Sequence, residues 1–134
     1  MFDAISVGAT GTKKLTVAAE HTAAAWGSGL LDVLSTPHMV ALMEGAAVNA
    51  VDPLLPDGFR TVGTRLDVSH VAATPVGQEV TARAELIAID GRRLVFRVEA
   101  TSGAGVIGEG THERFIIEVE RFMARAAARA QGER

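Results

Sequence analysis

A chain of 134 residues, 48% hydrophobic and 22% charged, has enough material to bury a core as one compact domain, residues 1–134. The formal net charge is −3 and the basic residues are scattered, so no basic patch for binding nucleic acid or an anionic membrane is expected. Cysteine is absent, which excludes disulfides, thiol nucleophiles and thiolate metal sites. Because no apolar stretch is long enough to cross a bilayer, a soluble, cytoplasmic protein is expected.

The first predicted element is a strand over residues 13–19, where Leu15 and Val17 alternate onto one face. The segment 21–34 is small, glycine-bearing and holds the only tryptophan, Trp26. We expect a loop with a helical turn there, in a position to cover a site. His21 and His38 are expected to be surface or loop histidines.

A long helix is predicted from Thr36 to about Val51. Thr36 can cap the unpaired N–H groups of the first turn, and Pro37 suits the first helical position. At 100° per residue, one stripe of this helix is apolar and should face the core. Its members are Met39, Val40, Met43, Ala47 and Ala50.

Glu44 is the most informative residue of this helix, because glutamate is almost never fully buried unless it is paired. It falls at the edge of the apolar stripe, two turns after Thr36 and about 80° around the helix from it. Both side chains can therefore line one groove without touching. An edge carboxylate paired with an arginine is the structural alternative to a catalytic one.

The remainder is predicted to be a strand meander, with turns at Thr74-Pro75-Val76-Gly77, Asp90-Gly91 and 102–105 and a last strand from Val106 to about Val119. Alternation assigns these residues to the inward faces of the first three strands: Val62, Thr64, Leu66, Val68 and His70; then Val80, Ala82, Ala84, Leu86 and Ala88; then Leu94, Phe96, Val98 and Ala100. The alanine- and arginine-rich tail, about residues 120–131, should be helical. The fold class is α+β, with one antiparallel sheet against the central helix.

Several polar residues on these strands have two interpretations. His70, alone on an apolar face, is either a satisfied core histidine or a catalyst. Arg114 could pair with Glu44 or contact a ligand, and Gly63 is most simply a residue that packs closely in its strand. His112 is taken as an ordinary strand residue. No pair of histidines has metal-ligand spacing, so no metal site is predicted.

Four runs of sequence, in this order and spacing, resemble the hotdog-fold thioesterases and, among them, the fluoroacetyl-CoA thioesterase group. The resemblance covers roughly residues 12–122 and implies an antiparallel sheet wrapped around a long central helix. It also implies a homodimer joined through edge strands, with the sites at the interface. The runs are MVALMEGAAVNAV (39–51), SHVAATPVGQEVTARAEL (69–86), GRRL (91–94) and IGEGTHERFII (107–117).

The resemblance also implies an activity and a site. Thr36, Glu44 and His70 match the catalytic threonine, glutamate and histidine of the family, Gly63 matches a glycine near the reacting carbonyl, and Arg114 matches an arginine near the acyl group. The implied reaction is hydrolysis of a small acyl-CoA thioester, with CoA as part of the substrate and no other cofactor. Glu44 would either attack the carbonyl or activate water as a general base.

Parts of the substrate site stay open. The segment Trp26-Gly27-Ser28-Gly29-Leu30 has glycine and leucine where the fluoroacetyl-specific enzyme has gate phenylalanines, so the acyl group is undetermined. Arg92-Arg93 and Lys13-Lys14 are candidates for the CoA phosphates. A non-catalytic acyl-CoA binding module is an alternative function. A hotdog hydratase or dehydratase is another, although no Asp/His arrangement with that family's spacing is present.

Overall fold

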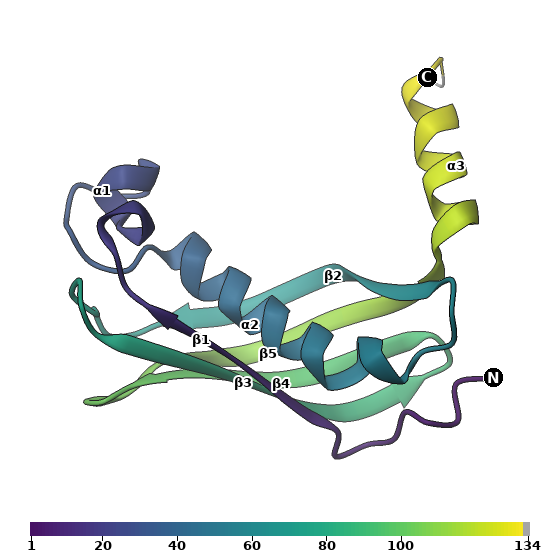
Figure 1. Ribbon diagram of the computed structural model, residues 1–134, viewed down its shortest axis with the longest axis horizontal. Helices are drawn as coiled ribbons and strands as arrows, with labels where there is room; N and C mark the ends of the chain where they lie inside the picture. Colours follow the sequence, from purple (N-terminus) through teal and green to yellow (C-terminus); the bar gives the residue numbers. More distant parts are fainter. Residues whose placement is uncertain (133–134) are drawn as a thin grey trace.

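The computed structural model describes residues 1–132 and has the predicted α+β architecture. Five strands form one antiparallel sheet in the order β1-β3-β4-β5-β2, and the sheet curls around helix α2 (Figure 1). The strands are β1 (Thr10–Thr16), β2 (Phe59–His70), β3 (Glu79–Asp90), β4 (Arg93–Ser102) and β5 (Gly105–Glu118). The helices are η1 (Ala19–His21), α1 (Ala23–Trp26), α2 (Thr36–Val51), η2 (Asp52–Leu54) and α3 (Val119–Ala130).

Helix α2 has the predicted bounds, but its cap is a different residue. Ser35 has the extended backbone of an N-cap, and its hydroxyl accepts a hydrogen bond from the His38 N–H at 3.1 Å. The predicted capping role of Thr36 is therefore wrong, because Thr36 already lies inside the first turn, followed by Pro37. The Thr36 hydroxyl is left available for a contact elsewhere.

The buried face of α2 is wider than one stripe because the sheet curls around the helix (Figure 1). Of the predicted stripe, Val40 is only partly buried, whereas the other members are in the core. The buried residues of α2 are Met39, Leu42, Met43, Ala46, Ala47, Ala50 and Val51.

Strands β3 and β4 supply the opposite side of the core. All the predicted inward residues of these strands are fully buried except Ala88. The pairing of β3 with β4 shifts between Leu86 and Ala88, and this bulge turns Ala88 outward. Phe96 is the largest of the fully buried side chains, and its truncation to alanine should cost about 3–5 kcal/mol of stability.

A second bulge changes the predicted facing of β2. The register with β5 shifts between Gly63 and Arg65, so strict alternation does not continue through the strand. Thr61 and Gly63 pair with the inward residues Ile116 and Arg114, and His70 lies on the inward face after the bulge. The inward assignment of Val62 and Thr64 is therefore wrong.

Strand β1 begins three residues earlier than predicted and ends before Val17. It pairs antiparallel with β3, from Thr10 opposite Glu85 to Thr16 opposite Glu79. Gly11 allows this edge of the sheet to approach the helix, since a Cβ at that position would clash with the Ala46 carbonyl of α2. The expected loop with a helical turn is present as η1 and α1.

Helix α3 forms where the tail predicts one and projects from the end of β5 away from the sheet (Figure 1). It contributes no buried residue, and Phe122 and Met123 are exposed on it. Strand β2, twelve residues long, forms one edge of the sheet. Within residues 1–132, no helix is both long and apolar enough to span a membrane.

Candidate active site

The structure places three of the predicted site residues together beside the edge strand β2. Glu44 Oε2 lies 3.9 Å from Arg114 Nη1, so the two side chains form an ion pair. The Glu44 side chain is 44% exposed and that of Arg114 only 8%, so the carboxylate can meet a ligand while the cation is held inside. Gly63 borders both groups: a Cβ there would lie 2.9 Å from Glu44 Oε2 and 3.3 Å from Arg114 Nη1.

The guanidinium of Arg114 is fixed on its other side by the backbone and hydroxyl of Thr61. Arg114 Nε donates to Thr61 Oγ1 at 2.8 Å, and Nη2 donates to the Thr61 carbonyl at 3.0 Å. Thr61 in turn donates to Asp52, from Oγ1 to Oδ1 at 2.6 Å and from its N–H to Oδ2 at 3.1 Å. Burial lowers the pKa of Arg114, and the carboxylates of Asp52 and Glu44 oppose that effect.

His112 completes the surroundings of Arg114. Its Nδ1 lies 2.8 Å from the Arg65 carbonyl, which can only accept, so Nδ1 carries the proton. Its Nε2 then accepts from Arg114 Nη1 at 3.1 Å. Burial lowers the pKa of His112, with a further lowering from the Arg114 cation. A neutral imidazole with a defined tautomer is therefore the form that fits this site.

Thr36 and His70 form a second pair. Thr36 Oγ1 and His70 Nδ1 are 2.8 Å apart. The other ring nitrogen, His70 Nε2, is buried and has no hydrogen-bond partner among the described residues. Burial lowers the pKa of His70, an effect that the nearby Ala72 backbone partly offsets.

A cavity of about 280 Å³ lies over this second pair. Its walls combine the Thr36–His70 pair with the segment after α1 and the chain that follows β2. The lining residues are Ala23, Ser28, Val33, Leu34, Thr36, His70, Val71, Ala72 and Ala73. The segment 21–34 therefore borders this cavity, and Leu30 within the segment is 94% exposed.

The five predicted site residues thus form two groups within one chain. Glu44, Gly63 and Arg114 are together, and Thr36 and His70 are together. Thr36 and Glu44 are eight positions apart, which separates the two groups by roughly 12 Å along the helix. Gly63 and His70 are likewise seven residues apart on β2. A single chain does not bring all five residues to one point.

Three residues that surround Arg114 in the first group were not predicted from sequence: Asp52, Thr61 and His112. Strand alternation could have indicated two of them, since His112 lies two residues before Arg114 and Thr61 two residues before Gly63. Asp52 follows directly after α2, and no sequence pattern pointed to it. The interpretation of His112 as an ordinary strand residue is wrong, because its ring contacts the candidate site.

His21 and His38 are partly buried, which corrects the expectation of surface or loop positions. Their rings lie edge to face with centroids 5.1 Å apart, and the Trp26 ring lies 4.5 Å from that of His38. These three residues line a cavity of about 370 Å³ on the β1 side of α2. No group of three or more metal-binding side chains occurs within residues 1–132.

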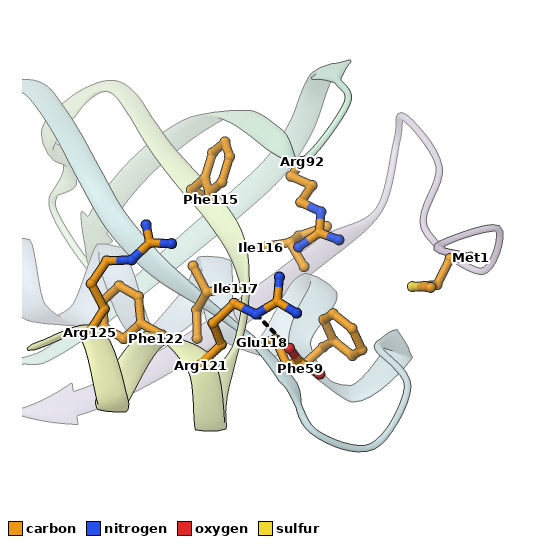
Figure 2. Close-up of a pocket in the computed structure, with 10 residues that line it drawn as sticks. All are labelled: Met1, Phe59, Arg92, Phe115, Ile116, Ile117, Glu118, Arg121, Phe122 and Arg125. Carbon is orange, nitrogen blue, oxygen red and sulfur yellow. Dashed lines mark ion pairs between the residues drawn. The ribbon is translucent and has the colours of Figure 1, made fainter.

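Another cavity, of about 390 Å³, lies where β5 continues into α3 (Figure 2). Arg92, Arg121 and Arg125 lie around it, and a dashed line in Figure 2 marks the ion pair between Arg121 and Glu118. The Arg121 Nε and Glu118 Oε1 atoms are 3.5 Å apart. The Arg92 guanidinium also lies 5.7 Å from the centre of the Phe59 ring. The lining residues are Met1, Phe59, Arg92, Phe115, Ile116, Ile117, Glu118, Arg121, Phe122 and Arg125.

Comparison with known proteins gives matches over most of the chain. Residues 17–120 match the model of the family described as fluoroacetyl-CoA-specific thioesterase. A protein of Streptantibioticus cattleyicolor named fluoroacetyl-CoA thioesterase is 49% identical over 94 residues, which are 70% of this chain and 68% of that protein.

Solved structures agree with this assignment. The structure of the fluoroacetyl-CoA thioesterase FlK matches with a TM-score of 0.87 and 39% identity, over 92% of this chain and 96% of that chain. A hot-dog-like protein from Thermanaerovibrio acidaminovorans matches with a TM-score of 0.88 and 26% identity, over 97% of this chain and 96% of that chain. The fold is therefore the hotdog fold, and the chain belongs to the fluoroacetyl-CoA-specific thioesterase family.

Proposed function

We propose that this protein hydrolyses the thioester of a small acyl-CoA to the free acid and CoA. The observation that carries the proposal is the Glu44 carboxylate, half exposed, beside a buried arginine and next to a glycine that leaves its oxygen uncovered. Membership of a thioesterase family supports the same reaction. The catalytic unit proposed is one domain, residues 1–134, of which the last two lie outside the described part of the chain.

Glu44 is the proposed reactive group. As a nucleophile it would attack the thioester carbonyl, expel the CoA thiolate and leave an anhydride that water opens. As a general base it would remove a proton from water, which attacks the carbonyl directly. Arg114 Nη1, 3.9 Å from the carboxylate, supports either route because a cation there stabilises negative charge on Glu44 or on the acyl oxygen beside it.

Thr36 and His70 are the proposed partners in proton transfer. The hydrogen bond between Thr36 Oγ1 and His70 Nδ1 orients the imidazole, and Nε2 is left for water or the leaving thiolate. The Gly63 N–H is the proposed donor to the developing oxyanion. One such donor typically contributes about 3 kcal/mol to the lowering of the barrier.

We propose a homodimer because the two groups of site residues are apart in one chain. Strand β2 is an edge strand with unpaired backbone groups, and a second copy could pair with it to continue the sheet. Antiparallel pairing centred between Leu66 and Asp67 would set His70 opposite the partner's Gly63. The Thr36–His70 pair of one copy would then join Glu44, Gly63 and Arg114 of the other.

The CoA phosphates have a candidate site in the cavity at the start of α3. Arg93, proposed with Arg92 from the sequence, is bound to Glu113 at 2.6 Å, whereas Arg92 lines this cavity with Arg121 and Arg125 (Figure 2). Arginines bind phosphate oxygens, and the phenylalanines of the cavity offer surfaces for a base. Arg114 and Glu118, which lines this cavity, are four positions apart on β5. The distance of roughly 13 Å is one that an extended pantetheine arm can span.

The substrate is proposed to be CoA-linked and freely diffusing, in the cytoplasm, with no further cofactor. The acyl group is left to experiment, because the cavity over Thr36 and His70 is open and its walls include Ser28 and Val33 of the segment 21–34. Its volume of about 280 Å³ gives room for more than a two-carbon acyl group.

The test is release of CoA thiol from a panel of short, branched, aromatic and halogenated acyl-CoAs. Wild-type protein should turn over at least one of them, and Glu44→Ala should lose the activity. Glu109→Ala, which removes an exposed glutamate paired with Arg97 on the outer side of the sheet, is the matched control and should remain active. Absence of thiol release across the panel would leave an acyl-CoA binding module, and a change in enoyl absorbance without thiol release would indicate a hydratase.

A further inference from the structure

Only one nitrogen of the Arg114 guanidinium, Nη1, forms the ion pair with Glu44. Nη1 lies 3.9 Å from Glu44 Oε2, whereas Nε and Nη2 are both engaged by Thr61. An arginine side chain has several rotatable bonds, so a single ion pair at this distance would not fix its position. What determines the location of Nη1 is the set of contacts behind it.

Those contacts form a continuous chain of hydrogen bonds that runs away from the proposed active site. The Asp52 carboxylate accepts both the N–H and the hydroxyl of Thr61, and the Thr61 hydroxyl accepts Arg114 Nε. Asp52 comes from η2, Thr61 from β2 and Arg114 from β5, so three separate elements are joined. Charge-assisted bonds to a carboxylate are stronger than neutral ones, which makes this chain a firm anchor.

His112 restrains the guanidinium from a different direction. Nη1 donates to His112 Nε2 at 3.1 Å, and the histidine itself is fixed by the Arg65 carbonyl. The charged and titratable groups that meet here are Glu44 of α2, Asp52 of η2, and His112 and Arg114 of β5. The Arg114 cation thus interacts with two carboxylates and one neutral imidazole, an arrangement that holds Arg114 in one orientation.

We propose that Asp52, Thr61 and His112 are positioning residues for the thioesterase reaction. They place Arg114 Nη1 at the point where it contacts Glu44, without touching the substrate. The inference rests on the proposed role of Glu44. It adds that the catalytic carboxylate is supported by a chain of residues that extends to the end of the central helix.

Thr61 offers the sharpest test because two substitutions distinguish the effect of its hydroxyl from the effect of its side-chain volume. Thr61→Val keeps the volume and removes the hydroxyl, and it leaves Asp52 Oδ1 and Arg114 Nε without their shared partner. Thr61→Ser keeps the hydroxyl. Thr111→Val, at an exposed threonine of β5, is the matched control. Misplacement of a catalytic neighbour by about 1 Å typically costs on the order of 100-fold in rate.

The expected result is a loss of about 10- to 100-fold in kcat/KM for Thr61→Val, restoration of most of the activity in Thr61→Ser, and no loss in Thr111→Val. Asp52→Asn should reproduce the loss, and it serves as the second variant if Thr61→Val does not fold. His112→Phe, which keeps a ring but removes the acceptor, should also lower activity. Thermal unfolding of every variant is measured alongside.

A readout that does not depend on activity separates this inference from the proposed function. In the wild-type protein, the Arg114 Nε–H should give a slowly exchanging NMR signal, because Thr61 binds it in a buried position. That signal should broaden or exchange rapidly in Thr61→Val and persist in Thr61→Ser. If no acyl-CoA is hydrolysed, the proposed function fails, and this signal still tests the anchoring of Arg114. A folded Thr61→Val protein with full activity and an unchanged Nε–H signal would overturn the inference.

Discussion

The hydroxyl of Thr36 and the Nδ1 atom of His70 are 2.8 Å apart although 34 positions of sequence separate the two residues. Thr36 can make this contact because Ser35, and not Thr36, caps helix α2. The contact fixes the orientation of an imidazole whose other nitrogen is buried without a partner in the described part of the chain. Oriented imidazoles of this kind serve in proton transfer.

The pH dependence of activity should reflect the burial of His70. Because burial lowers its pKa, the imidazole stays neutral below the usual histidine value of 6.5. If the neutral form is the active one, the acid limb of kcat/KM should lie below pH 6.5. His70→Gln should lower kcat by about 10²- to 10⁴-fold and remove this limb. An acid limb above pH 6.5 that persists in His70→Gln would assign it to another group.

The stability of the folded protein, like its activity, should decrease as the pH is lowered. His70 and His112 both have a lowered pKa in the folded protein, so the unfolded chain binds their protons more readily. The free energy of unfolding should therefore fall as the pH drops through 6.5 and continue to fall until the folded-state pKa values are reached. Urea unfolding between pH 8 and pH 5 measures this, and His112→Gln should flatten the curve. A wild-type curve that rises toward low pH would contradict the burial of neutral histidines.

Gly63→Ala should affect catalysis more than folding. The new Cβ would lie 2.9 Å from Glu44 Oε2, and the end of a flexible side chain can move away. The carboxylate would then leave its position, and a loss of about 100-fold in kcat/KM is expected. Gly103→Ala, at a glycine where a Cβ meets nothing within 4 Å, is the control. Equal activity of the two variants would remove Gly63 from the site.

Mixed dimers should reveal whether the site is shared between two chains. Glu44→Gln and His70→Gln homodimers should each be inactive. A heterodimer of the two variants would contain one complete site, with His70 from one chain and Glu44 from the other. Co-expression with two affinity tags, followed by a thiol-release assay, measures this. An inactive heterodimer would place the whole site within one chain, and a monomer by light scattering would exclude the shared site.

The arginine-lined cavity at α3 should affect CoA esters but not shorter thioesters. Loss of a charge-assisted contact to phosphate in Arg125→Ala should raise KM for an acyl-CoA by about ten-fold. The corresponding acyl-pantetheine has no nucleotide, so its kcat/KM should be unchanged. Arg83→Ala, at an exposed arginine of β3 paired with Glu85, is the control. Equal effects on both substrates would show that this cavity does not hold the nucleotide.

The amino-acid sequence was enough to predict the central helix from Thr36 to about Val51, the antiparallel meander and the helical tail. Helical and strand periodicities are local properties of the chain. Alternation correctly predicted the buried residues of β4, and those of β3 as far as Leu86. Residue runs also indicated the thioesterase family and the candidate residues Thr36, Glu44, Gly63, His70 and Arg114. Where a bulge interrupts a strand, as at Thr64 and before Ala88, alternation assigned the wrong face.

The grouping of the candidate residues, in contrast, depends on tertiary contacts. Asp52, Thr61 and Arg114 come from three elements, and their hydrogen bonds depend on how the sheet curls around α2. The sequence could not show that His112 is a neutral acceptor for Arg114, because tautomer and burial follow from packing. The separation of Thr36 from Glu44 follows from helix rise. The free edge of β2, on which the proposed homodimer depends, is a property of the sheet order, which long-range pairing sets.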